Sequence, residues 1–105
     1  MAFKGAIKAG RTVVAELRLN ATSRGAALVF MAAGSANGVS SSGRVVVVPG
    51  GAGAITLVPA QEGILEIEVD MTDEDDPGQL IVTVNGKKRA KEKVTGDTSW
   101  TYAIT

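Results

Sequence analysis

The chain has 105 residues, with 11 basic and 11 acidic side chains, no histidine and no cysteine. A single domain over residues 1–105 is the natural size for this length. Without cysteine there are no disulfides or cysteine-based zinc sites, and without histidine there is no imidazole base. Zero net charge argues against a dedicated nucleic-acid-binding protein. The sequence therefore predicts one non-enzymatic domain with no catalytic residue, metal or cofactor.

The hydrophobic core is expected to be thin. Hydrophobic residues make up 45% of the chain, but 15 of them are alanine and aromatic residues are only 4%. Alanine burial stabilises a fold much less than burial of a large side chain, which contributes about 1.5–3 kcal/mol. Because disulfides are excluded, oligomerisation is the support that we expect for so small a core.

No membrane partner is expected. The longest apolar run, residues 26–33, is far shorter than the roughly 20 residues that span a bilayer. The segment that starts Met-Ala-Phe-Lys lacks the apolar centre of a signal peptide, so we expect synthesis in the cytoplasm. The compartment is otherwise open, and a virion is one candidate.

The first half of the chain contains four predicted strands. Alternating apolar residues predict a strand at 12–19. Apolar runs predict strands at 26–31, 45–48 and 55–58, although a short helix at 26–33 is an alternative. The runs at 26–31 and 45–48 do not alternate, which indicates burial on both faces. Residues 34–43 and 50–53 have the composition of loops.

The second half of the chain contains four more predicted strands. The strongest alternation lies at 63–71, followed by 79–84, 87–94 and 100–104. Asn85-Gly86 is suited to the type I′ turn of a hairpin between 79–84 and 87–94. About eight short strands at regular spacing predict an all-β fold, a single small antiparallel β-sandwich of immunoglobulin-like or jelly-roll-like type.

The acidic loop at residues 70–76 is the one candidate for a metal. Crowded carboxylates can hold calcium, but the spacing is not that of an EF-hand. Pro77-Gly78 favours an ordinary turn. We expect a solvated turn without metal.

Charge is distributed unevenly. Eight of the 11 acids lie in residues 62–76, and five of the 11 bases lie in 87–93. In one interpretation the lysines protect a sheet edge, and cross-strand pairs add stability. Alternatively, an acidic patch on one copy meets a basic patch on the next. The candidate interface residues are Glu66, Glu68, Asp70, Lys87, Lys88, Arg89, Lys91 and Lys93.

Trp100 and Tyr102 are the only tryptophan and tyrosine, and they fall on one face of the last predicted strand. If exposed, they would form a stacking platform for a carbohydrate. If buried, they would anchor this strand to the core. The scarcity of other aromatic residues favours burial.

Two functions fit these patterns. The first is a structural protein that self-associates or decorates a larger assembly, for example a small capsid or tail accessory protein of a virus or phage. The second is a carbohydrate-binding or adhesive module that uses Trp100 and Tyr102. The expected partners are accordingly a second copy or other proteins of an assembly, with carbohydrate as the alternative.

Overall fold

The computed structural model describes residues 5–34, 40–59, 61–72 and 78–105. Within these ranges the backbone forms nine strands and no helix, so the all-β prediction is confirmed. The strands are β1 (Ala6–Ile7), β2 (Val13–Leu19), β3 (Ala26–Gly34), β4 (Ser40–Val47), β5 (Ala52–Leu57), β6 (Gly63–Met71), β7 (Gly78–Val84), β8 (Lys87–Val94) and β9 (Thr98–Ile104). In these ranges no helix is long and apolar enough to cross a membrane.

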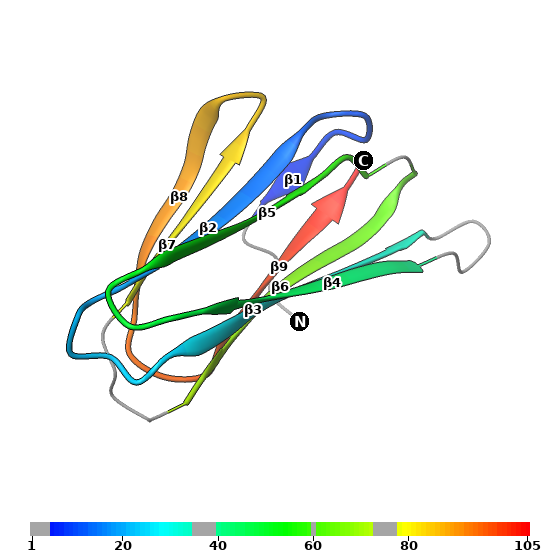
Figure 1. Ribbon diagram of the computed structural model, residues 1–105. Helices are drawn as coiled ribbons and strands as arrows, with labels where there is room; N and C mark the ends of the chain where they lie inside the picture. The colour runs from blue at the N-terminus through cyan, green and yellow to red at the C-terminus, as the bar shows by residue number, and fades with distance from the viewer. Residues whose placement is uncertain (1–4, 35–39, 60, 73–77) are drawn as a thin grey trace.

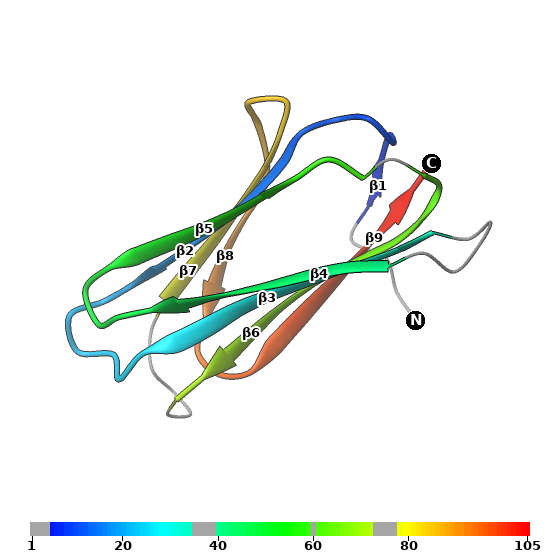
Figure 2. The ribbon, with the colours of Figure 1, turned by 45° about the vertical axis from the view of Figure 1, so that its right-hand side comes forward.

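The strands form two sheets that pack face to face as a β-sandwich (Figures 1 and 2). Sheet A has the order β1-β9-β6-β3-β4, and sheet B has the order β5-β2-β7-β8. Six of the seven strand pairings are antiparallel. The exception is the short parallel pairing of β1 with β9 at one edge of sheet A, which the sequence did not predict.

Alternation within each strand builds the core between the sheets. In β6, Leu65, Ile67 and Val69 are fully buried, and their neighbours in the sequence point to the outer face. In β2, alternate residues from Val13 to Leu19 are buried in the same way. This period of two is the geometry of a strand with one face on a core and the other toward solvent.

Two predicted boundaries were wrong. Strand β4 begins at Ser40, whereas residues up to 43 were expected to form a loop. Its first half pairs with β3, and a Cβ at Gly43 would overlap the Phe30 ring. The aromatic ring therefore occupies the space that a side chain at this position would take. Strand β5 likewise begins at Ala52, inside the second predicted loop. Residues 26–33 are strand, and the helical alternative is excluded.

The hairpin between β7 and β8 is confirmed. Asn85 and Gly86 have φ angles of 49° and 81°, the left-handed values that a type I′ turn requires. Asn85 also bonds to the start of β2: its backbone N–H donates to the Thr12 carbonyl at 2.8 Å, and its Oδ1 accepts from the Thr12 N–H at 2.8 Å. These two bonds fix the hairpin tip against the segment between β1 and β2.

Candidate functional site

An acidic row follows the outer face of β6. Glu66, Glu68 and Asp70 alternate with the buried residues of this strand, so all three point away from the core. A side-chain hydrogen bond with Asp70 and the negative charge of Asp70 raise the pKa of Glu68 above its ordinary value, and partial burial, Glu66 and Asp97 add to the effect. The carboxylates therefore repel one another within one copy. The rest of the predicted acidic loop, residues 73–76, lies outside the described ranges.

Beside this row, the same face of sheet A exposes apolar side chains. We use the name apolar stripe for Met31, Val46, Val48 and Ile64, which are 48%, 69%, 64% and 43% exposed. Val46 lies one strand away from Ala27, and Ala27 lies opposite Asp70, so the stripe borders the acidic row. The prediction that the valine run 45–48 is buried on both faces is wrong within one copy. Only Val47 is buried, because alternation turns Val46 outward.

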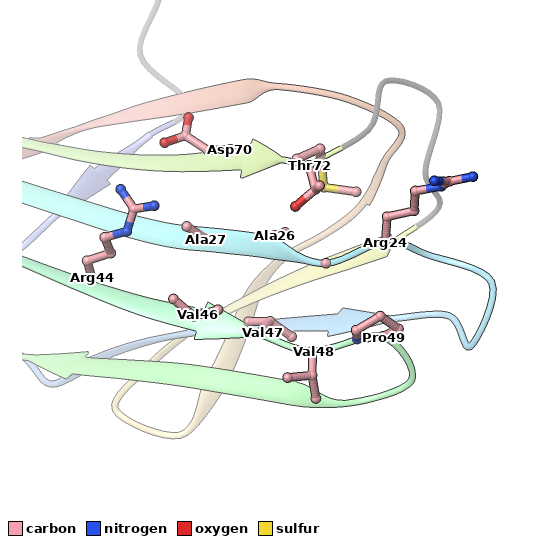
Figure 3. Close-up of a pocket in the computed structure, with 12 residues that line it drawn as sticks. Arg24, Ala26, Ala27, Arg44, Val46, Val47, Val48, Pro49, Asp70 and Thr72 are labelled. Carbon is pink, nitrogen blue, oxygen red and sulfur yellow. The ribbon is translucent and has the colours of Figure 1, made fainter.

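A hollow of about 390 Å³ lies at the end of this face, where β4 and β6 end and β3 begins (Figure 3). Val46, Val48 and Pro49 supply part of its apolar wall. Arg44 and Asp70 project from the strands on either side of β3 (Figure 3). The hollow thus combines apolar lining residues with two arginines, Arg24 and Arg44, and one carboxylate, Asp70.

The predicted basic strand is divided between two places by a β-bulge. Val82 pairs with Ala90 but Thr83 pairs with Lys88, so Arg89 is an extra residue in β8. On the outer face of sheet B, the β8 residues opposite Thr83, Ile81 and Gln79 are Lys88, Lys91 and Lys93. Lys87 and Arg89 instead line a second hollow. The sequence grouped these five bases together, and the bulge separates them.

The second hollow has a volume of about 320 Å³ and is named here the basic hollow. Its lining residues are Ala6, Lys8, Arg11, Val84, Asn85, Lys87 and Arg89. The Arg89 guanidinium is held in place because Nη2 donates a hydrogen bond to the Ala6 carbonyl at 2.9 Å. Sequence reasoning did not identify Lys8 and Arg11 as part of a site. Only the fold brings them to the β7–β8 hairpin, so no local pattern could have found them.

Trp100 and Tyr102 lie in the core. They are 3% and 2% exposed and point between the sheets, so they form no stacking platform on the surface. Trp100 Nε1 donates a hydrogen bond to Glu92 Oε2 at 2.8 Å, which joins β9 of sheet A to β8 of sheet B. Burial is the main cause that raises the pKa of Tyr102; the Glu92 charge adds to it, and the Arg89 charge opposes it.

Within the described residues, no group of three or more acidic side chains is placed to hold a metal ion. The candidate interface residues fall into three sets: the acidic row on sheet A, the lysines on sheet B and the basic hollow at one end of the sandwich.

Comparisons of the chain with protein-family models, with curated proteins and with solved structures gave no match.

Proposed function

We propose that this chain is a non-enzymatic structural protein that self-associates through the outer face of sheet A. A decoration or accessory protein of a viral shell or tail is one setting for such a domain. The observation that carries the proposal is the apolar stripe, because its exposed side chains lie on one face and two of them, Val46 and Val48, border one hollow. Scattered apolar residues are normal on a protein surface, but contiguous ones mark sites of interaction.

Covering the apolar stripe would contribute favourable free energy to association. Burying a large aliphatic side chain completely contributes about 1.5–3 kcal/mol. Val46 is 69% exposed, so covering it with a second copy would contribute roughly two thirds of that, about 1–2 kcal/mol. Four such side chains, together with the half-buried Val29 beside them, would supply the centre of an interface.

The charges favour a particular geometry. The acidic row lies on the outer face of sheet A, and Lys88, Lys91 and Lys93 lie on the outer face of sheet B. These faces are on opposite sides of the sandwich, so the two sets cannot pair within one copy. A contact between them joins different patches of successive copies, which produces a ring or an open stack rather than a two-fold dimer. Exposed charge pairs contribute at most about 1 kcal/mol each, so they select the register while the apolar stripe supplies the affinity.

Sedimentation of Val46→Asp and Thr95→Asp tests the proposal. Thr95 is a matched control because it is similar in size to valine and also exposed, but it lies in the turn between β8 and β9, outside the strands of both faces. We expect the wild type and Thr95→Asp to form the same oligomer, and Val46→Asp to weaken association at least tenfold, since about 1.4 kcal/mol corresponds to a factor of ten. A monomeric wild type at high concentration, or equal effects of the two variants, would contradict the proposal.

A second variant tests the geometry separately. Replacing Lys88, Lys91 and Lys93 with Glu brings like charges together in the proposed stack, and we expect this variant to assemble less well while its melting temperature stays close to that of the wild type. Raising the salt concentration should reduce the difference from wild type, because screening weakens exposed charge contacts. Normal assembly of the reversed variant at low salt would exclude the head-to-tail arrangement and leave the apolar contact to be judged by Val46→Asp.

A further inference from the structure

The basic hollow concentrates positive charge in a chain whose net charge is zero. Four of its seven lining residues are cationic: Lys8 and Arg11 come from the segment between β1 and β2, and Lys87 and Arg89 come from β8. None of the lining residues is acidic. Within the described part of the chain, none of these four cations forms an ion pair. A free copy therefore holds four mutually repelling charges around one space, and an anion placed there would relieve that repulsion.

The backbone around the hollow is held in place before any ligand arrives. The Thr12–Asn85 pair of hydrogen bonds joins the two segments that carry the cations, at 2.8 Å each. Both segments lie at the same end of the sandwich (Figures 1 and 2). The bulge at Val82/Thr83 places Arg89 out of the lysine series, and the Ala6 carbonyl then holds its guanidinium. This carbonyl engages one guanidinium nitrogen, which leaves N–H donors on the other nitrogens for a ligand.

We propose that the basic hollow binds a tetrahedral oxyanion, that is, a phosphate or sulfate group. Two guanidinium groups and two ammonium groups match a multiply charged anion with several acceptor oxygens, because arginine forks bind such oxygens in a bidentate way and lysine adds point charges. A volume of about 320 Å³ is at the lower end of the range for ligand sites, and it exceeds what one inorganic anion fills. We therefore expect a phosphate or sulfate carried on a small organic molecule to bind more tightly than the free ion.

This site is independent of the proposed assembly. It lies at one end of the sandwich and uses neither Val46 nor the three lysines on the face of sheet B; of the apolar stripe only Ile64 lies nearby, two strands from Ala6 in the register of sheet A. Failure of one proposal thus leaves the other unchanged. Binding can be measured on Val46→Asp as well as on the wild type.

The test is an NMR titration of the ¹⁵N-labelled chain with sodium phosphate, sodium sulfate, glucose 6-phosphate, sodium acetate and sodium chloride at matched ionic strength. We expect saturable shifts at the amides of residues 8–12 and 85–89 with phosphate and sulfate, and saturation at lower concentration with the sugar phosphate. Acetate and chloride should give only small shifts without saturation. Equal affinity for free phosphate and sugar phosphate would assign the site to the free ion. Shifts that do not saturate, or that are the same for all five salts, would overturn the proposal.

Matched variants locate the site. Lys87→Gln/Arg89→Gln removes two charges from the hollow, and Lys91→Gln/Lys93→Gln removes two charges from the same strand on the outer face of sheet B. We expect the first pair to weaken phosphate binding at least tenfold and the second less than threefold. Arg11→Gln, which leaves β8 intact, should weaken binding as well. Equal losses for the two double variants would show a general charge effect and would overturn the site.

Discussion

The hydrogen bond between Trp100 and Glu92 joins the two sheets, and replacing Glu92 with alanine measures its contribution. The indole ring is 3% exposed, and its N–H donates to Glu92 Oε2 at 2.8 Å. A hydrogen bond to a charged group contributes about 1.5–3 kcal/mol, and its loss leaves a buried donor without this acceptor. Glu92 is only half-buried, so water partly replaces its carboxylate. We therefore expect a loss near the lower limit, about 1.5–2 kcal/mol.

Urea unfolding followed by fluorescence is the suitable assay, because Trp100 is the only tryptophan and lies at the bond itself. At about 4–8 °C per kcal/mol, the expected loss also lowers the melting temperature by about 6–16 °C. Glu92→Gln keeps an acceptor oxygen and should retain most of the stability. Lys91→Ala, at the exposed neighbouring position, should change it by less than about 0.5 kcal/mol. The reasoning is refuted if Glu92→Ala is as stable as Lys91→Ala, or if Glu92→Gln loses as much as Glu92→Ala.

Two further predictions concern ionisation. Tyr102 is the only tyrosine, so ultraviolet absorbance should show its pKa above the ordinary value of 10.0. We expect Glu92→Gln to lower this pKa and Arg89→Gln to raise it further. The stability that the buried neutral phenol contributes is present below pH 10 and is lost as pH rises further. An unshifted titration in both variants would contradict these contacts. Because Glu68 has a raised pKa in the folded chain, its ionisation lowers stability as pH rises through the carboxyl range. Glu68→Gln should therefore be more stable than wild type at pH 7, by about 0.5 kcal/mol or less as for other surface changes, and thermal melts should show no difference below about pH 4.

Local patterns were sufficient for much of the fold. Strands 63–71 and 87–94 have the predicted bounds, and the Asn85-Gly86 turn has the predicted backbone geometry. In each case the information lies within a few residues, either as alternation or as a dipeptide that tolerates positive φ. The burial of Trp100 followed from composition, since so few aromatic residues were available to fill the core.

Features that depend on distant contacts could not be predicted. Strand β1 has two residues and forms only through parallel pairing with β9 at the other end of the chain. The Ser/Gly-rich start of β4 resembles a loop by composition, and its strand conformation depends on pairing with β3. The bulge that separates Arg89 from the lysines is a property of two paired strands, so the sequence of β8 alone does not reveal it. The basic hollow, which needs both the bulge and the β1–β2 segment, was missed for the same reason.

The valine run 45–48 connects the failed prediction with the proposed function. Its lack of alternation indicated burial on both faces, whereas one copy buries Val47 at 2% and leaves Val46 and Val48 exposed at 69% and 64%. Threonine is also β-branched and also favours strands, so it would satisfy the backbone at both positions and leave a hydroxyl toward water. Strand formation therefore does not account for valine there. Under the proposed self-association, a second copy would cover both side chains, and the outward residues of a covered strand are apolar like those of a core.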